Sequence, residues 1–594
     1  MSNTITNGTA VRLTIPSGQS LAVSSISGAF SASIVGGVGS GTVLATNSTD
    51  GAVYGPYSTG AIIDLTSSAS SVIDYDIGIT PVNAFNQTSK YAFDQAGNAT
   101  GLVGPDGGVV QFAASLGNVV RVALMGDSMT ASAGGNTTAT SVTRLNGVVT
   151  VVATGVNLTT GMIVRIYNCL DTSYNNNSAY VTRIDANTIT YVSPGADGST
   201  SNLTGLAPMT VQNNSYLNSN SYLFWLNSKT GGAFRMVANG GSNGNTSANM
   251  LPRIATDCLV FNPQAVIIMC GYNDFPGSSL TAAQVFANVT AMIAQCVGKL
   301  VVVVSAIPWT SGGTTANRQE AAKYNRLIRA YCNSNPRCRF ADAAKYLVDF
   351  NNATRFSPLA GMLRTDNIHP SPKGAERIAQ SILDAIQFDF ARPSRLVNNQ
   401  ADTFGFDATN PNILDNAPFT NTGGAVAGGT TGAAAAQYAV TLTNTSTLAA
   451  CVASCPARAD GIGFDQQAVF TAGGVGDVCT FSIGTGNISG RFTAGDRVLI
   501  LGELSLSGLS GANIRGFSIG LSLPGTSGSP AMVTDAGDNL TTAQIGIDGV
   551  YTLVSNEIVI PVGCTGISWS VTFTASAAGT PLTVKLGRCA IEKI

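Results

Sequence analysis

Four nearly continuous apolar runs in the middle of the chain constrain its fold more than any other feature. They are Val119–Met125, Phe234–Ala238, Gln264–Cys270 and Leu300–Ile307. Strands that other elements cover on both faces have this composition, whereas half-exposed strands alternate apolar and polar residues. The runs therefore predict buried strands of one sheet, and active groups in such sheets lie just beyond the carboxyl ends of the strands.

Helical periodicity lies between and after these runs, over residues 285–296, 324–331 and 375–386. The second of these segments is expected to bury Tyr324, Leu327, Ile328 and Tyr331. Alternating strands and helices predict an α/β domain over residues 116–395, with a parallel sheet and helices on both of its faces.

The regions around this domain are predicted to be β-rich. Residues 1–115 contain short β-branched segments between Gly, Ser and Asn clusters, which indicates an attachment or spacer domain. Residues from about 138 to 205 form hairpin-like strands with a turn at Asn146-Gly147, and we interpret them as a small β insertion in the α/β domain. Residues 396–594 alternate again and predict a β-sandwich, a possible carbohydrate-binding or trimerisation module.

Composition and charge exclude several classes of protein. Of the 594 residues, 44% are hydrophobic and 10% charged, with a formal net charge of −2. This balance argues against a disordered chain and, without a basic field, against a nucleic-acid partner. The longest aliphatic run, Leu300–Ile307, is far shorter than the ~20 residues of a membrane-spanning helix. The first residues lack a basic end and an apolar stretch, so we expect neither a secretory signal nor membrane insertion.

The chain contains one histidine, His369, and eleven cysteines. A single histidine excludes zinc sites built on histidine pairs, and no C-x-x-C pair replaces them, so we expect neither a metal nor a cofactor. Cys332 could pair with Cys338, and Cys451 with Cys455, but an odd total without a signal peptide favours reduced thiols.

Four short polar blocks follow the apolar runs or precede the last helical segment. They are Gly126-Asp127-Ser128, Asn239–Thr246, Gly271–Asp274 and Asp366–His369. A serine at the end of a parallel strand can project into a cleft, where a following helix would lend its amino end to a developing anion. An asparagine amide can donate to the same oxygen. The spacing of Asp366 and His369 can let the carboxylate accept from one imidazole nitrogen while the other faces Ser128.

The four blocks, in this order, resemble the SGNH (GDSL-type) hydrolase family over about residues 116–390, apart from the insertion. The resemblance implies a flavodoxin-like, three-layer domain with a five-stranded parallel sheet. It also implies that Ser128 is the nucleophile, that His369 is the base and that Asp366 orients it. The implied oxyanion hole consists of the N–H groups of Ser128 and Gly244 and the side chain of Asn273. The 116 positions between Ser128 and Gly244 depart from the shorter connection usual in the family.

Other interpretations of these residues remain open at this point. Gly244 could serve a turn, Asn273 could cap a helix and Asp366 could act only in a cap or turn, with Asp342 as the reserve for the third catalytic position. Asp274 is expected to be structural. Gly516–Gly520 fits the G-x-S-x-G pattern of another hydrolase class, but it lies in an alternating segment with no histidine after it, and we reject it.

The flanking β regions resemble those of bacteriophage tail spikes and fibres. On this analogy the chain is a serine esterase that removes O-acetyl groups from a capsule or O-antigen. It would act outside the cell on the virion, as a homotrimer, with other tail proteins as possible partners. Two alternatives are an esterase that acts on other glycans, lipids or small esters, and a non-catalytic glycan-binding adhesin.

Overall fold

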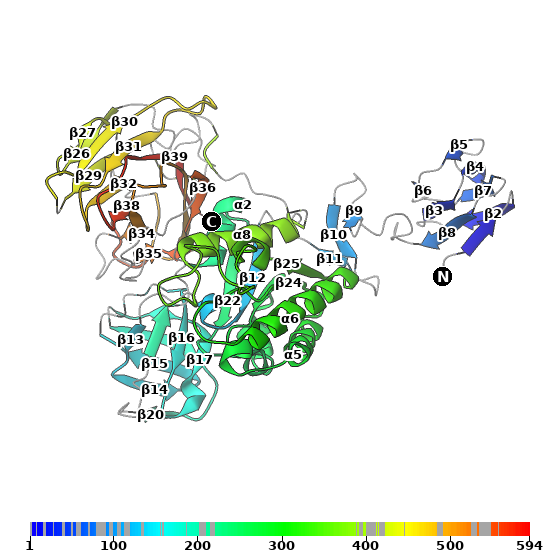
Figure 1. The fold of residues 1–594 in the computed structure, drawn as a ribbon, viewed down its shortest axis with the longest axis horizontal. Coiled ribbons are helices and arrows are strands. Elements are labelled where there is room, and N and C mark those ends of the chain that lie inside the picture. The colour runs from blue at the N-terminus through cyan, green and yellow to red at the C-terminus, as the bar shows by residue number, and fades with distance from the viewer. Residues whose placement is uncertain are drawn as a thin grey trace. The chain divides into compact units, whose positions relative to one another are not determined.

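The structure is a computed structural model with two compact units (Figure 1): Met1–Leu116 with Ser334–Arg337, and Gly117–Asn333 with Cys338–Ile594. No helix among the described residues is long and apolar enough to span a membrane. The described residues are 3–6, 9–15, 20–27, 29–37, 42–48, 52–54, 61–68, 72–78, 91–93, 99–103, 109–111, 119–131, 136–200 except 155, 157, 159 and 186, 210–213, 220–387, 389–390, 396–398, 412, 414, 422–483 except 437 and 445, 491–523, 531–533, 548–555 and 557–593.

A five-stranded parallel sheet forms the centre of the second unit, as the apolar runs predict. Its order is β22-β12-β23-β24-β25, so the strands follow one another in the chain as 2-1-3-4-5, the order of flavodoxin-like sheets. The strands are β12 (Val120–Gly126), β22 (Phe234–Gly241), β23 (Ala265–Met269), β24 (Leu300–Val304) and β25 (Cys338–Ala341).

Helices cover both faces of this sheet. The helices α2 (Tyr222–Thr230) and α8 (Pro372–Ile386) pack against each other over one face, and α5 (Ala282–Gln295) and α6 (Thr315–Ser334) cover the other. The start of α5 is set by Thr281 and Gln284, which form a capping box. The shorter helical segments are α1 (Ser128–Ala131), α3 (Ser247–Met250), α4 (Ile254–Asp257), η3 (Leu259–Phe261), η4 (Asn273–Gly277) and α7 (Ala344–Leu347).

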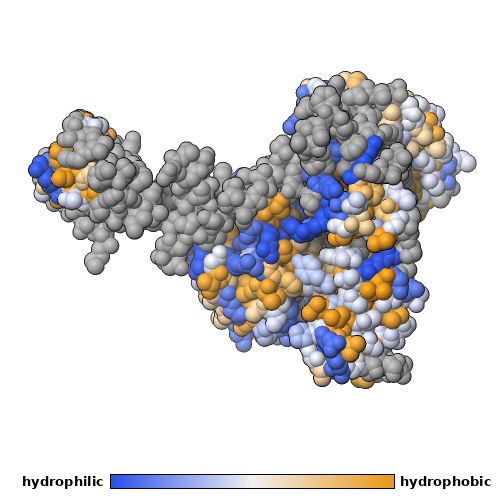
Figure 2. Space-filling view, turned by 180° about the vertical axis from the view of Figure 1, so that it is seen from behind, coloured by the Kyte–Doolittle hydropathy of each residue, from blue (hydrophilic) through white to orange (hydrophobic). Residues whose placement is uncertain are grey.

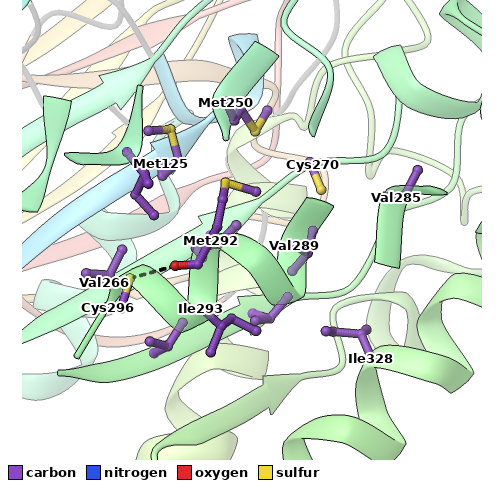
Figure 3. Close-up of a cluster of buried hydrophobic side chains, with 14 of the residues drawn as sticks. Met125, Met250, Val266, Cys270, Val285, Val289, Met292, Ile293, Cys296 and Ile328 are labelled. Atoms are coloured by element: carbon purple, nitrogen blue, oxygen red, sulfur yellow. Dashed lines mark hydrogen bonds between the residues drawn. The ribbon is translucent and has the colours of Figure 1, made fainter. Parts of the chain in front are cut away.

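The core between α5 and the sheet is drawn in Figure 3. Val289 and Met292 of α5 are fully buried beside Met125 of β12 and Val266 of β23. Burying an aliphatic side chain of this size stabilises a fold by about 1.5–3 kcal/mol. The thiol of Cys296 donates to the backbone carbonyl of Met292 at 3.3 Å, which gives the last turn of the helix a buried polar contact.

One prediction for the helices is wrong. Leu327 of α6 is 36% exposed, whereas Tyr324 and Ile328 of the same helix are fully buried. Consecutive residues of a helix point about 100° apart around its axis, so the residue just before a buried one can lie at the edge of the buried face. Leu327 takes that edge position.

The inserted β module is larger than the sequence indicates. Its strands run from Asn136 to Asn213, beyond the expected 138–205, and form a four-stranded sheet, β13-β21-β16-β17, and a five-stranded one, β18-β19-β15-β14-β20. It has its own hydrophobic core, which includes Val142, Val164 and Ile166. The strands are β13 (Asn136–Thr138), β14 (Ser141–Leu145), β15 (Val148–Val152), β16 (Ile163–Tyr167), β17 (Asn176–Tyr180), β18 (Thr182–Arg183), β19 (Thr188–Val192), β20 (Gly198–Thr200) and β21 (Thr210–Asn213), with the short helix η2 (Thr172–Tyr174).

The C-terminal part of the second unit consists of two seven-stranded sheets. Their buried faces meet, since the Sγ atoms of Cys451 in β30 and Cys479 in β32 lie 3.8 Å apart across them. Trp569 is 2% exposed and belongs to this core. The strands are β26 (Thr422–Ala427), β27 (Thr431–Gly432), β28 (Ala434–Ala435), β29 (Tyr438–Thr443), β30 (Ala450–Ser454), β31 (Gln466–Thr471), β32 (Val478–Ile483), β33 (Arg497–Ser507), β34 (Ile514–Ser522), β35 (Ala531–Val533), β36 (Gly549–Val554), β37 (Ile558–Val559), β38 (Ser568–Ala575) and β39 (Leu582–Lys593).

The described strands of the first unit form antiparallel sheets. Two sheets have four strands, β1-β8-β3-β6 and β2-β7-β4-β5, and a third, β11-β10-β9, has three. Phe30, Ile63 and Leu65 are fully buried among them. The strands are β1 (Asn3–Thr6), β2 (Ala10–Ile15), β3 (Ser20–Ser27), β4 (Phe30–Gly37), β5 (Val43–Ser48), β6 (Ala52–Tyr54), β7 (Ala61–Ser67), β8 (Val72–Gly78), β9 (Tyr91–Phe93), β10 (Ala99–Val103) and β11 (Val109–Gln111).

All eleven cysteines are free thiols, including the candidate pairs Cys332 with Cys338 and Cys451 with Cys455. On the face of the molecule shown in Figure 2, hydrophobic residues lie in small groups among hydrophilic ones.

Candidate active site

Three neighbouring strands of the central sheet end at one edge, and a polar block follows each of them. Ser128 follows β12, Gly244 follows β22 and Asn273 follows β23. Because β12 pairs with β22 on one side and with β23 on the other, the three blocks lie side by side. The order of the strands reverses here, and open α/β sheets bind their ligands at such a point.

Ser128, His369 and Asp366 form a continuous chain of contacts at this edge. The Oγ of Ser128 lies 2.8 Å from the Nε2 of His369, and the Nδ1 of His369 lies 2.7 Å from the Oδ2 of Asp366. An ionised carboxylate only accepts hydrogen bonds, so Nδ1 carries the proton and donates it to Asp366. Nε2 then has a free lone pair, toward which the hydroxyl of Ser128 donates.

The loop that carries Asp366 and His369 is held by its own hydrogen bonds. The Oδ1 of Asp366 accepts the backbone N–H groups of Ile368 and His369, both at 2.9 Å. Asn367 has a φ of +64°, a left-handed conformation that asparagine adopts more readily than most residues. Directly after the loop, Ser371 caps the first turn of α8. One oxygen of Asp366 therefore fixes the turn while the other meets the imidazole.

These contacts also set the charge of Asp366. Burial by itself would raise the pKa of its carboxyl. The hydrogen bonds from the ring and the backbone N–H of His369 and from the N–H of Ile368 outweigh burial and hold this pKa well below its usual range. The carboxylate is therefore ionised at neutral pH, as a group that orients and balances an imidazolium must be.

The turn at Ser128 depends on close packing of the backbone. A Cβ at Gly126 would lie 2.1 Å from Oγ1 of Thr130 and 2.8 Å from the carbonyl oxygen of Met269. The helix expected after Ser128 is a single turn, α1. Such a turn is too short for a substantial dipole, so the packing around Gly126 positions the hydroxyl.

Asp127 lies behind the nucleophile and is 1% exposed. Its Oδ1 accepts the N–H of Met129 at 2.9 Å. Burial, and in smaller part the charge of Asp274, raises the pKa of Asp127 to about 7, although the N–H of Met129 and the proximity of His369 act in the opposite direction. The carboxyl therefore keeps its proton to a higher pH than an ordinary aspartic acid does.

Two backbone N–H groups at this edge are available to a ligand. Within the described residues, neither the N–H of Ser128 nor that of Gly244 has a hydrogen-bond acceptor. Gly244 has a φ of +75°, which suits glycine, and it lies between two anchored residues. Ser242 donates its N–H to Gly126 at 3.0 Å, and Asn245 donates its N–H to the carbonyl of Ser242 at 3.2 Å.

Asn273 extends this set with a side chain. Its Nδ2 donates to the carbonyl of Asn245 at 3.1 Å and to the Oδ2 of Asp127 at 3.4 Å. Thr281, rather than Asn273, caps the next long helix, so the cap alternative for Asn273 does not hold. The contact with Asp127 is the longer of the two. The amide hydrogen of Asn273 that makes this contact is therefore the one that a ligand could accept instead.

The other aspartates that the sequence singled out have separate partners. Asp274 is fully buried and accepts the N–H of Ser247 at 2.8 Å and its hydroxyl at 2.6 Å, which ties η4 to α3. Asp342, the reserve candidate, pairs with Arg329 and does not contact His369. Gly516–Gly520 lies within β34, away from any strand-to-helix turn.

Two residues without a predicted role also contact the site. Asp127 lies inside the first polar block, between Gly126 and Ser128. Its position next to the candidate nucleophile is a sequence signal from which a role in the site could be predicted. Arg165 lies in the insertion, and its Nη2 donates to the Oγ of Ser242 at 2.8 Å. No sequence pattern marks that contact, because it joins residues 77 positions apart in different modules.

One protein family matches part of the chain. Residues 208–377 match the GDSL-like Lipase/Acylhydrolase family. The match begins just before β21, the last strand of the insertion, so Ser128 lies outside it and joins it only in the folded sheet. No curated protein matches the chain.

Several solved structures are similar to parts of the chain. One is a lipolytic protein of the G-D-S-L family from Desulfitobacterium hafniense, with 19% identity, 27% of this chain and 86% of that chain covered, and a TM-score of 0.24. A lipase/acylhydrolase from Enterococcus faecalis has 20% identity, 27% and 80% coverage and a TM-score of 0.23. An acetylxylan esterase from Geobacillus stearothermophilus has 20% identity, 30% and 84% coverage and a TM-score of 0.25. The family match shows that the chain carries a domain that is similar to the GDSL-like lipases and acylhydrolases.

Proposed function

We propose that the protein is a serine hydrolase of carboxylic esters, with Ser128 as nucleophile, His369 as general base and Asp366 as the group that orients it. The contact of 2.8 Å between Oγ of Ser128 and Nε2 of His369 carries this proposal. A serine hydroxyl is a weak nucleophile at its ordinary pKa, and an adjacent base in turn held by a third group is the arrangement that activates it.

Acylation begins when Nε2 of His369 takes the proton of Ser128 as Oγ attacks the ester carbonyl. The carbonyl oxygen becomes an oxyanion in the tetrahedral intermediate. The free N–H groups of Ser128 and Gly244 and the amide of Asn273 would receive it, and each such donor contributes roughly 3–4 kcal/mol to the stability of the transition state. The imidazolium is balanced by Asp366 and then returns its proton to the leaving alcohol.

Deacylation uses the same groups in reverse. His369 takes a proton from water, which attacks the acyl-enzyme, and the second tetrahedral intermediate forms in the same oxyanion hole. Collapse of this intermediate releases the acid and gives the proton back to Ser128. Atoms and charges are balanced over the cycle without any further group.

Hydrolysis of p-nitrophenyl acetate tests the proposal, with labelling by a fluorescent phosphonate as a second readout. Ser128→Ala should lower kcat by at least about 10³-fold and abolish labelling. Ser371→Ala removes another serine of the same region, and this variant should still be labelled. A wild-type protein that neither hydrolyses the ester nor is labelled at Ser128 would refute the assignment.

We further propose that the ester is an O-acetyl group on a bacterial surface polysaccharide, and that the chain works as part of a homotrimeric phage tail spike. What supports this is the modular plan, in which β-rich parts precede, interrupt and follow the hydrolase domain. The test is acetate release from purified capsule or O-antigen by wild type and Ser128→Ala. Activity on p-nitrophenyl acetate without release from any polysaccharide would favour a small-ester or lipid substrate, and binding without hydrolysis would favour an adhesin.

A further inference from the structure

The inserted module contacts the hydrolase core through one face of its four-stranded sheet. Ser178 of β17 donates its hydroxyl to the carbonyl of Asp257 at 3.2 Å, and the hydroxyl of Tyr180 donates to the carbonyl of Val237. The ring of Tyr180 also packs on Phe261, with the centroids 5.5 Å apart. The module is therefore fixed along α4 and along β22, the strand whose end leads to Gly244.

Arg165 lies on this face, in the middle of β16. Its neighbours Val164 and Ile166 point into the core of the insertion, so Arg165 points toward the hydrolase. Its Nη2 donates to the Oγ of Ser242 at 2.8 Å, and its guanidinium lies 4.5 Å from the centroid of the Tyr167 ring. One flat cation thus contacts an aromatic ring and a hydroxyl together, which the compact ammonium of a lysine does poorly.

The contact of Arg165 with Ser242 lies next to the residues that form the candidate oxyanion hole. Ser242 is 5% exposed, and its N–H is bonded to the carbonyl of Gly126, two residues before the nucleophile. Its own carbonyl accepts the N–H of Asn245, so a short loop from Ser242 to Asn245 is closed at both ends. Gly244, with its free N–H, lies inside that loop.

A second arginine contacts the strand that leads into this loop. Arg253, the N-cap residue of α4, donates to the carbonyl of Gly240 in β22 at 3.2 Å and pairs with Asp257. Arg253 belongs to the hydrolase core, whereas Arg165 comes from the insertion. Burial disfavours the charged form of Arg165 and lowers its pKa; the nearby charge of Arg253 adds to this effect, and Tyr167 and Asp257 partly offset it. A cation in such a position contributes to the structure only if its hydrogen bond is made.

We infer that Arg165 is a positioning residue of the hydrolase, which acts through Ser242 to fix the loop that presents the N–H of Gly244. The insertion is on this view an integral part of the active site. The inference rests on the proposed function and deepens it. Donors for a developing oxyanion must be in place before the reaction, and a misplacement of about 1 Å can cost about 10²-fold in rate.

Steady-state kinetics with p-nitrophenyl acetate test this inference. Arg165→Met and Ser242→Ala should each lower kcat about 10- to 100-fold while KM changes less than about threefold, because the loop acts in the transition state. The double variant should lose no more than the worse single variant, since both substitutions remove one contact. Arg165→Lys should recover part of kcat.

Arg144 provides the matched control. It is also an arginine of the insertion, more deeply buried than Arg165, and stacks 4.1 Å from the centroid of the Tyr174 ring, but its hydrogen bonds go to Ser173 and Ala196 within the insertion. Arg144→Met should leave kcat unchanged. Equal losses for Arg144→Met and Arg165→Met would overturn the inference, because they would show that only the stability of the insertion matters. A rise in KM with an intact kcat for Arg165→Met would do the same.

Hydrogen exchange separates this inference from the proposed function. The backbone of residues 240–250 should exchange faster in Arg165→Met and Ser242→Ala than in the wild type or Arg144→Met. An active wild-type enzyme whose exchange and kcat are unaffected by Arg165→Met contradicts the inference alone. A wild-type protein that is inactive and unlabelled at Ser128 contradicts the proposed function, whatever the exchange shows.

Discussion

The Oδ2 of Asp127 lies 3.4 Å from the Nδ2 of Asn273, in the buried space behind Ser128. This contact links a carboxyl that burial pushes toward its neutral form to the amide that we assign to the oxyanion hole. A charged carboxylate holds the amide hydrogen more strongly than a neutral acid does. The protonation of Asp127 therefore bears on how readily Asn273 turns toward a substrate.

The first prediction concerns the stability of the fold as a function of pH. The pKa of Asp127 is raised to about 7, so between about pH 4 and pH 7 the folded protein holds a proton that the unfolded chain has released. The free energy of unfolding should consequently fall as pH rises through this window, by up to about 1.4 kcal/mol per pH unit. Asp127→Asn cannot ionise, and its Tm should vary less over this range.

Thermal unfolding of the wild type and Asp127→Asn from pH 4 to pH 8 measures the effect. The pKa of Asp274 is also raised by burial and contributes a slope of the same sign, so the variant should flatten the profile without abolishing the slope. Asp185→Asn is the control, since the N–H of Asn187 lowers the pKa of that exposed carboxyl and moves its own slope below about pH 4. Identical profiles for Asp127→Asn and the wild type would contradict the prediction.

The second prediction distinguishes the two aspartates that the sequence left as candidates for the third catalytic position. Asp366→Asn removes the acceptor that holds Nδ1–H of His369 and should lower kcat by about 10²- to 10⁴-fold. Asp342→Asn breaks only a half-exposed pair with Arg329 and should change kcat less than about twofold. Ester hydrolysis at fixed pH by the two variants decides between them, and comparable losses would remove Asp366 from the mechanism.

The third prediction concerns Asn273. Asn273→Ala removes one donor from the oxyanion hole and should lower kcat by about 10²- to 10³-fold with little change in KM. Asn317→Ala is a matched variant, because the Nδ2 of Asn317 also donates to a nearby backbone carbonyl, that of Phe275 at 2.7 Å, without facing Ser128. An Asn273→Ala enzyme with wild-type kcat would show that the two backbone N–H groups suffice.

The four polar blocks of the candidate site can be found in the sequence because each depends on local chemistry. Three features are recognisable in the sequence alone. They are a glycine before the serine, at Gly126, an amide after a buried strand, and an aspartate three residues before the single histidine. The adjacency of β22, β12 and β23 then follows from the way parallel sheets are built. Proximity within the site was therefore implied by the order of the blocks.

Contacts between modules leave no such pattern. The alternation of the strand that contains Arg165 predicts only that this side chain faces away from the insertion's own core. Nothing in that strand's sequence predicts the hydrogen bond to Ser242. The extent of the insertion was also underestimated, because its first and last strands, β13 and β21, are short and polar. The exposed position of Leu327 likewise depends on how far the neighbouring elements cover α6.

The fourth prediction addresses the close packing that places Ser128. Gly126→Ala would put a Cβ 2.1 Å from Oγ1 of Thr130 and 2.8 Å from the carbonyl of Met269, and the second of these is backbone of the adjacent strand that cannot move independently. Overpacking of this kind costs about 1–3 kcal/mol and shifts the backbone that carries the nucleophile, so both Tm and kcat should fall. Gly277→Ala, whose Cβ would meet no atom closer than 3.8 Å, should preserve both. Calorimetry with ester hydrolysis measures the pair, and an active, equally stable Gly126→Ala variant would show that the end of β12 is free to adjust.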